Sequence, residues 1–155
     1  MSSVLFVCTG NICRSPTAEG ILRHKLKSLG VLGRFSIDSA ATHSYHTGHP
    51  PDDRTVAVAR EYGVELGDLR ARAVMAGDFQ DFQTILAMDR NHLRILKTMT
   101  PDPYAGELRL FLDYCPGMEG QDVPDPYYGE IRGFHDVYAL IERGVDGFLR
   151  SLLDS

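Results

Sequence analysis

The chain has 155 residues, of which 43% are hydrophobic and 24% charged, and this length is enough to enclose one hydrophobic core. Its net charge of −5 argues against nucleic acid as a partner, because that contact depends on neutralising phosphates, and it equally disfavours an anionic membrane surface. The longest unbroken apolar run, residues 4–8, is too short for insertion across a bilayer. Three cysteines do not suit a disulfide framework, and no secretory signal is recognisable, so the sequence predicts a cytoplasmic protein with reduced thiols.

The N-terminal segment predicts a strand, a short polar loop and a helix in immediate succession. Residues 4–7 are apolar and rich in valine, as expected of a strand buried on both faces. The polar loop follows, and Ser15 with Pro16 is typical of a helix start. Apolar residues then recur at helical spacing until Gly30, which favours a helix end.

The remainder of the chain continues this alternation. Strands are predicted at residues 35–39, 82–88 and 108–111, and helices at residues 56–62, 91–99 and 137–152. The pattern indicates an α/β fold: a single three-layer domain, residues 1–155, with helices on both faces of a central four-stranded parallel sheet. Ligands bind such sheets at the carboxyl ends of the strands, which is where Cys8 lies.

The loop after the first strand has the composition of a phosphate-binding site. Five residues separate Cys8 from Arg14, directly before the expected helix N-terminus. Successive backbone N–H groups at such a turn bind a phosphate dianion, and Gly10 permits a tight or positive-φ turn. Arg14 can donate two parallel N–H bonds to phosphate oxygens, and the same positive field favours the nucleophilic thiolate of Cys8. A cysteine near a strand end can also be merely buried, but this context favours phosphate chemistry.

Two segments resemble one family. Residues 7–16, Val-Cys-Thr-Gly-Asn-Ile-Cys-Arg-Ser-Pro, are similar to the signature of the low-molecular-weight protein tyrosine phosphatases. Residues 125–128, Asp-Pro-Tyr-Tyr, resemble the general-acid loop of that family. The resemblance implies the phosphotyrosine protein phosphatase I-like fold. It also implies hydrolysis of phosphotyrosine in proteins, and of small aryl phosphates, through a cysteinyl-phosphate intermediate.

The resemblance also implies the catalytic roles. Cys8 would attack phosphorus, Arg14 would bind the phosphoryl oxygens, and Asp125 would protonate the leaving phenolate and then activate water. Standing alone, Asp125 before a proline would be interpreted as a turn residue. Because Asp125 must be protonated while Cys8 is ionised, we expect a bell-shaped pH profile with its optimum below neutrality.

Supporting roles follow from the same resemblance. Ser15 would hydrogen-bond the thiolate and could at the same time cap the helix. Asn11 would brace the loop through Ser39, or simply tolerate a strained turn. Asp89 matches an acid that orients the arginine, and by itself it suits a helix N-cap. The residues assigned to the phosphate-binding loop besides Cys8 and Arg14 are Thr9, Gly10, Asn11, Ile12, Cys13 and Ser15.

The remaining expectations concern the cleft and the thiols. Tyr127 and Tyr128 match one aromatic wall of the family's cleft and Tyr45 the opposite side, a slot that suits a phenyl ring. In the family a cysteine placed like Cys13 can form a reversible disulfide with the nucleophile, whereas Cys115 is most simply structural. Ala40 stands where the family commonly has glycine, and residues 70–73 match the family motif poorly.

Other functions share parts of this pattern. Arsenate reductases have the same fold and loop but usually lack the Asp-Pro acid loop, and protein arginine phosphatases carry threonine at the position of Ile12. A non-catalytic phosphotyrosine-binding module would need neither a thiolate nor an acid.

His43, His46 and His49 recur every third residue, which favours a solvated loop over a metal site. We therefore expect no cofactor and no metal, and a monomer.

Overall fold

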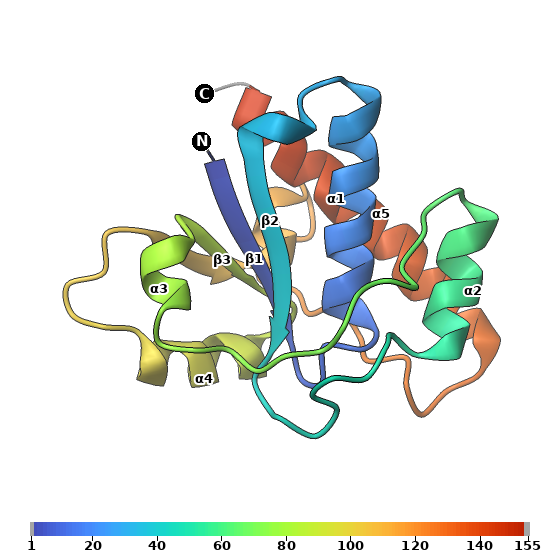
Figure 1. Cartoon of the computed structure of the whole chain (residues 1–155), viewed down its shortest axis with the longest axis horizontal. Helices are drawn as coiled ribbons and strands as arrows, with labels where there is room; N and C mark the ends of the chain where they lie inside the picture. The colour runs from blue at the N-terminus through green and yellow to red at the C-terminus, as the bar shows by residue number, and fades with distance from the viewer. Residues whose placement is uncertain (1, 154–155) are drawn as a thin grey trace.

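A parallel sheet of four strands forms the centre of the molecule, and a computed structural model describes it within residues 2–153 (Figure 1). Residues 1, 154 and 155, the ends of the predicted domain, lie outside the described part. The strand order is β2-β1-β3-β4, and all neighbouring pairs are parallel, as predicted. The strands are β1 (Ser2–Cys8), β2 (Phe35–Ala41), β3 (Thr84–Ala87) and β4 (Glu107–Leu110).

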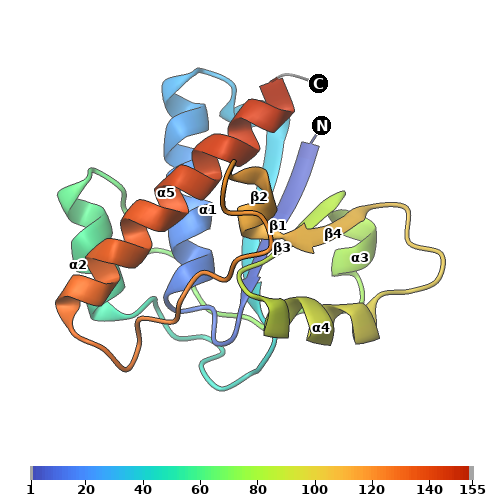
Figure 2. The ribbon, with the colours of Figure 1, turned by 180° about the vertical axis from the view of Figure 1, so that it is seen from behind.

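Helices cover both faces of this sheet, which gives the predicted three layers. On one face α1 and α5 pack together, with α2 against α5, and on the other lie α3 and α4 (Figures 1 and 2). Short 3₁₀ turns follow α1 and β4. The helices are α1 (Arg14–Ser28), α2 (Asp53–Glu61), α3 (Asp78–Asp81), α4 (Arg90–Met99) and α5 (Ile131–Leu153), and the 3₁₀ turns are Leu32–Arg34 and Phe111–Tyr114.

Strand β1 is covered on every side. Val4 and Phe6 point into the core beneath α1 and α5, whereas Leu5 and Val7 belong to the core beneath α3 and α4. The Phe6 ring meets Phe111 edge to face, with 5.8 Å between ring centroids. Because β1 pairs with β2 and β3 on its two edges and is buried on both faces, its carboxyl end is held rigidly.

The structure corrects several predicted boundaries. Helix α1 begins at Arg14, with Cys13 as a cap that makes no side-chain bond, so the predicted start at Ser15 was wrong. Strand β3 is shorter than the predicted residues 82–88, and it starts later because Phe82 caps α3: the Phe82 N–H donates to the carbonyl of Asp78, the first residue of that helix. Helix α3 was not predicted, since four residues are too few to display a periodicity. No helix within residues 2–153 is long and apolar enough to cross a bilayer.

Candidate active site

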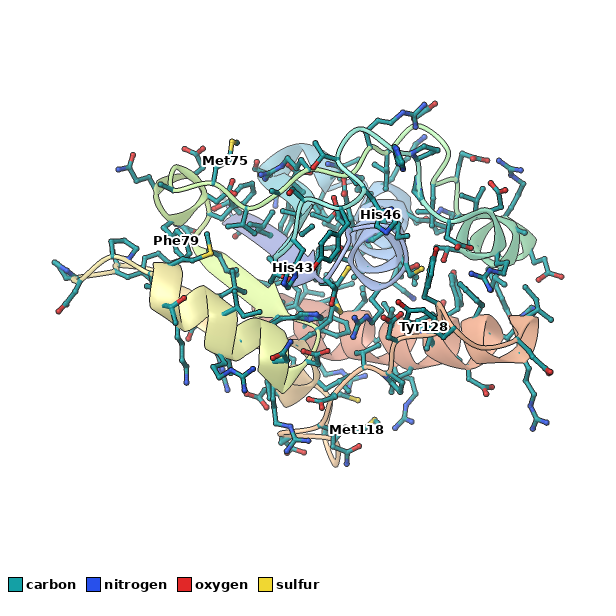
Figure 3. The ribbon with its side chains drawn as sticks, turned by 90° about the horizontal axis from the view of Figure 1, so that it is seen from below. His43, His46, Met75, Phe79, Met118 and Tyr128 are labelled. Carbon is teal, nitrogen blue, oxygen red and sulfur yellow. The ribbon has the colours of Figure 1, made fainter. Side chains whose placement is uncertain are left out.

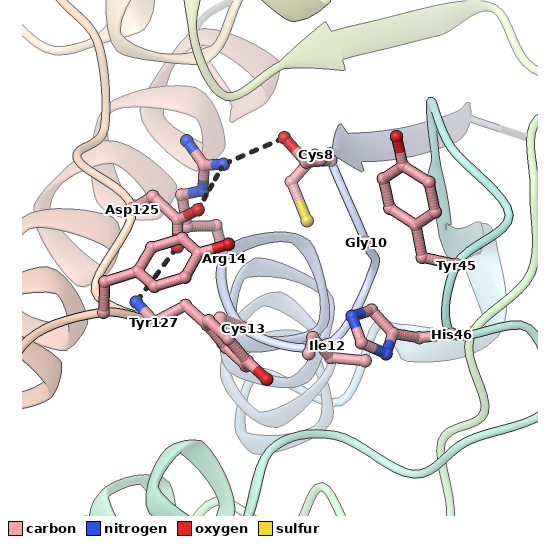
Figure 4. A pocket seen from close by; sticks show the side chains of 11 residues that line it. Cys8, Gly10, Ile12, Cys13, Arg14, Tyr45, His46, Asp125 and Tyr127 are labelled. Carbon is pink, nitrogen blue, oxygen red and sulfur yellow. Dashed lines mark hydrogen bonds and ion pairs between the residues drawn. The ribbon is translucent and has the colours of Figure 1, made fainter.

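A pocket of about 120 Å³ opens at the carboxyl end of β1, the edge of the sheet that Figure 3 views. It brings together segments that are more than a hundred residues apart in the sequence (Figure 4). The residues that line it are Cys8, Thr9, Gly10, Ile12, Cys13, Arg14, Tyr45, His46, Asp125, Tyr127 and Tyr128. The three residues expected to carry the chemistry, Cys8, Arg14 and Asp125, therefore share one cavity.

The backbone of the loop turns at Asn11, whose φ is +58°. Of the two alternatives predicted for Gly10, a tight turn or a positive φ, the positive φ was wrong, because Gly10 is not among the positive-φ residues of the described chain. Gly10 instead leaves room for the His46 ring: a Cβ there would lie 2.8 Å from Cδ2 of His46, which would then have to shift. Asparagine is among the residues that tolerate the left-handed region, so the turn costs little at this position.

The sulfur of Cys8 receives bonds from the first turn of α1. Its Sγ lies 2.9 Å from Ser15 Oγ and 3.4 Å from the Ser15 backbone nitrogen. Asn11 Nδ2 donates to Ser15 Oγ at 2.8 Å, so this oxygen acts as an acceptor there and its own proton is free for the sulfur. Ser15 thus hydrogen-bonds the Cys8 sulfur. Its further predicted role as a helix cap was wrong, because the N-cap of α1 is Cys13.

Asn11 is braced from three sides. Its Nδ2 also donates to Ser39 Oγ at 2.9 Å, and its Oδ1 accepts from the Arg72 backbone N–H at 3.1 Å. Ser39 in turn donates to Glu19 at 2.6 Å. Burial raises the pKa of Glu19, and the Ser39 bond opposes this. The poor match of residues 70–73 to the family motif does not affect the brace, because the donor is a backbone group.

The guanidinium of Arg14 is almost fully buried and its orientation is fixed by four neighbours. Nη1 donates to Asp89 Oδ2 at 2.9 Å and to the Val123 carbonyl at 3.0 Å, and Nη2 donates to Thr9 Oγ1 at 3.3 Å. On the same side, Asp125 Oδ2 lies 3.7 Å from Nη2. This arrangement holds a fixed positive charge beside the sulfur of the pocket.

Asp89 has both of the roles that its position allowed. Its Oδ1 accepts from the His92 backbone N–H at 2.9 Å, which caps α4, while its Oδ2 holds Arg14. The His92 ring joins this network through its Nε2, which lies 2.6 Å from Thr9 Oγ1; its Nδ1 lies 3.2 Å from Asp89 Oδ1 but makes no hydrogen bond within the described chain. Burial, followed by the Arg14 charge, lowers the pKa of His92 to about 4, so this ring is neutral at neutral pH.

Asp125 reaches the pocket from the long loop before α5. Its Oδ1 accepts from the Tyr127 backbone N–H at 3.1 Å, which leaves Oδ2 facing Arg14. The side chain is 40% exposed, so solvent has access to it. The carboxyl group therefore lies where it can exchange a proton with an atom bound in the pocket and with water.

Aromatic rings form the walls of the cleft above the loop. Tyr45 is 72% exposed and stacks on His43, with 5.1 Å between ring centroids. Tyr127 and Tyr128 meet edge to face at 5.0 Å, and the Tyr127 ring centroid lies 6.3 Å from that of His46. The expected aromatic residues do line the pocket, and His46 lies among them (Figures 3 and 4).

The three cysteines differ in their surroundings. All are free thiols in the structure and all are buried. Burial raises the pKa of Cys13 to about 12, against an opposing hydrogen bond with Thr55, so Cys13 remains a neutral thiol although it borders the pocket. Cys115 packs in the core and does not line the pocket. The reversible disulfide between Cys8 and Cys13 stays a prediction.

Sequence reasoning missed several residues of the site. His46 was predicted to lie in a solvated loop, with a metal site as the less favoured alternative, whereas it lies over Gly10 and lines the pocket; the adjacent match at Tyr45 was the available signal. Glu19 and His92 carried no recognisable signal, because their contacts depend on tertiary structure. Within residues 2–153, no group of His, Cys, Asp and Glu side chains is suited to hold a metal ion.

A parallel α/β sheet that presents a cysteine and an arginine from one anion-binding loop defines the class of cysteine-dependent phosphoester-binding α/β proteins. Comparison with known proteins narrows this class. A sequence model described as "Low molecular weight phosphotyrosine protein phosphatase" matches residues 3–155. The chain belongs to this family.

Individual relatives agree over nearly the full length. The low molecular weight protein-tyrosine-phosphatase YfkJ of Bacillus subtilis is 39% identical over 152 residues, which are 98% of this chain and 96% of the relative. The phosphatase of the same family from Schizosaccharomyces pombe is 39% identical over 96% of each chain. Among solved structures, a protein tyrosine phosphatase from Entamoeba histolytica, 34% identical, superposes with a TM-score of 0.93 over 99% of this chain and 98% of its own.

Proposed function

We propose that the protein hydrolyses phosphotyrosine in proteins, and small aryl phosphates, through a cysteinyl-phosphate intermediate. The observation that carries this proposal is the shared pocket: the Cys8 sulfur, the Arg14 guanidinium and the Asp125 carboxylate border one cavity of about 120 Å³ with aromatic walls. Phosphate binding alone requires neither a thiol at the base of the loop nor an acid opposite it, so the combination supports turnover.

In the first step the Cys8 thiolate attacks phosphorus. An S–P bond forms while the bond from phosphorus to the phenolic oxygen breaks, and Asp125 gives its proton to the departing oxygen. Arg14 stabilises the negative charge on the phosphoryl oxygens, together with the backbone N–H groups at the start of α1. The anchoring of Arg14 by Asp89 at 2.9 Å supports this role, because the guanidinium does not need to reorganise during the reaction.

In the second step water replaces the sulfur. The Asp125 carboxylate takes a proton from water, the water oxygen bonds to phosphorus, and the S–P bond breaks to release phosphate and restore the thiolate. Ser15, whose Oγ lies 2.9 Å from the sulfur, donates a hydrogen bond that makes the thiolate a better leaving group. Asp125 ends protonated, as the next cycle requires.

The preference for tyrosine esters follows from the cleft. Tyr45, Tyr127 and Tyr128 can pack against a phenyl ring, and Ile12 adds an apolar contact beside the sulfur. The small hydrophilic body of a phosphoserine or a guanidino phosphate gains little from such walls. We expect discrimination by kcat/KM, because the ring contacts also hold the ester in line with the sulfur.

The test is a phosphatase assay with phosphotyrosine, phosphoserine and phosphoarginine peptides, on wild type, Cys8→Ser and Asp125→Asn. Cys8→Ser should be inactive yet still bind phosphate, and Asp125→Asn should lose most of the rate on poor leaving groups. The pH profile of kcat/KM should be bell-shaped with its optimum below neutrality. A rate that still rises at pH 8, or a preference for phosphoarginine, would contradict the proposal.

The proposal extends to the setting of the enzyme. A thiolate nucleophile requires a reducing compartment, which supports a cytoplasmic location. The net charge of −5 supports protein substrates over nucleic acid. Cell fractionation and light scattering on the purified chain would test the location and the expected monomer.

A further inference from the structure

The side chain of Arg54 holds the loop that carries the proposed proton donor. Its Nη2 donates to the Tyr127 carbonyl at 3.0 Å, and its Nη1 lies 3.4 Å from the Gly129 carbonyl, which it also bonds. The guanidinium packs 4.3 Å above the ring of Phe134, at the start of α5. Arg54 thus contacts this loop from α2, a helix that is far from the loop in the sequence.

The same region of α2 is tied to the phosphate-binding loop. The backbone N–H of Asp52 donates to the Ile12 carbonyl at 2.9 Å. The carboxylate of Asp52 accepts two bonds from the Arg54 guanidinium, each of 3.0 Å, and a third from the Arg54 backbone N–H at 2.9 Å. Although burial alone would raise the pKa of Asp52, the bonds from Arg54 lower it, so the pair is held as an ion pair. The phosphate-binding loop and the loop of Asp125 therefore share one anchor.

The position of the Asp125 carboxylate depends on the peptide unit that Arg54 holds. The N–H of Tyr127 bonds to Asp125 Oδ1, and the carbonyl of the same residue bonds to Arg54. Within residues 2–153, Arg54 is the only residue outside residues 125–129 that hydrogen-bonds to this segment; the contact with Arg14 is an ion pair of 3.7 Å. The neighbouring Pro126 is buried and anchors the backbone, but the Asp125 side chain itself is 40% exposed, so its orientation depends on the hydrogen bonds of the Tyr127 peptide unit.

We propose that Arg54 is a positioning residue, which holds Asp125 at the distance from the phosphate-binding loop that proton transfer requires. The inference rests on the proposed function, in which Asp125 protonates the leaving oxygen. Loss of Arg54 would leave Cys8 and Arg14 in place but would let the donor move away. Because a displacement of about 1 Å can cost a hundredfold in rate, the effect should be large when the leaving group needs its proton, and small otherwise.

The experiment compares kcat/KM for two substrates, p-nitrophenyl phosphate with a good leaving group and phenyl phosphate with a poor one. We expect Arg54→Met to reduce kcat/KM for phenyl phosphate about tenfold or more, and for p-nitrophenyl phosphate about threefold or less. Arg60→Met is the matched control, because Arg60 is on the same helix but pairs with the exposed Glu65 at 2.8 Å. The control should leave both values unchanged.

A double-mutant cycle separates positioning from a general structural effect. In an Asp125→Asn background the donor is absent, so adding Arg54→Met should change kcat/KM for phenyl phosphate by less than about twofold. The inference would be overturned if Arg54→Met reduced kcat/KM equally for both substrates, or if it caused the same reduction for phenyl phosphate in the Asp125→Asn background as in the wild type.

A second variant covers the case in which Arg54→Met does not fold. Asp52→Asn preserves a capping side chain for α2 but removes the ion pair that orients Arg54, and it should give the same leaving-group pattern in weaker form. The single variant Asp125→Asn tests the donor role of Asp125 separately from the positioning role of Arg54. If it loses no more rate on phenyl phosphate than on p-nitrophenyl phosphate, the donor role itself fails, and the inference fails with it.

Discussion

Replacing His92 by glutamine should remove a large part of the acid sensitivity of the fold. His92 is fully buried, and its pKa lies at about 4 in the folded chain but near 6.5 in an unfolded one. Between these values the unfolded chain binds a proton that the folded chain does not bind. The free energy of unfolding therefore falls as the pH is lowered from about 6.5 to about 4, and this contribution is complete below pH 4.

The magnitude follows from the two pKa values. At about 1.36 kcal/mol for each pKa unit, the full contribution is roughly 3 kcal/mol, of which about 2 kcal/mol is already expressed at pH 5. His92→Gln also loses contacts with Thr9 and Asp89, but that loss is the same at both pH values. The stability difference between wild type and variant should therefore shrink by about 2 kcal/mol between pH 7.5 and pH 5.

Urea unfolding of both proteins at the two pH values measures this change. Other groups, such as the buried Glu19, also contribute to the pH dependence, but they are common to both proteins and cancel in the difference. His24→Gln, at an exposed position on α1, is the control and should leave the pH dependence of wild type unchanged. The reasoning is refuted if wild type and His92→Gln differ in free energy of unfolding by the same amount at pH 7.5 and at pH 5.

Two further substitutions test the second chemical step and the packing. Ser15→Ala should slow hydrolysis of the cysteinyl phosphate about tenfold, because it removes a hydrogen bond of about 1.5 kcal/mol to the Cys8 sulfur. A stopped-flow experiment should then show a burst of phenol. An unchanged steady-state rate would contradict this role of Ser15. Gly144→Ala should destabilise the fold by about 1–3 kcal/mol in urea, because its Cβ would lie 2.4 Å from Phe111. Gly133→Ala is its control, with no atom within 4 Å of the added Cβ, and an equal loss in both would contradict the packing argument.

The alternation of strands and helices was sufficient to predict the layers and the parallel sheet. It also placed Cys8 at the carboxyl end of a buried strand, because a strand, a polar loop and a helix follow each other without a gap. Asp125 is different: only its resemblance to a known loop singled it out, since an aspartate before a proline is common in turns. Periodicity could not detect α3, which has a single turn.

The contacts that support the site could not be predicted, because they depend on which strands lie side by side. His92 reaches Thr9 only because β3 is paired with β1, so that the start of α4 lies beside the phosphate-binding loop. Local rules failed at two positions for related reasons. The positive φ falls not on Gly10 but on Asn11, for which a strained turn was one of the predicted alternatives and whose side chain gains three partners. The capping rule was overridden at Ser15 by the sulfur of Cys8.

Because β1 is paired with both β2 and β3, Cys8 lies in a more stable part of the fold than Asp125. The proposed nucleophile ends the central strand β1, which is buried on both faces, whereas the proposed acid lies on a turn that Arg54 and the buried Pro126 anchor. Mild denaturing conditions should release the turn before they open the sheet. Under such conditions the protein should still bind phosphate esters at the phosphate-binding loop. It should hydrolyse esters with poor leaving groups slowly, because they need the displaced proton donor.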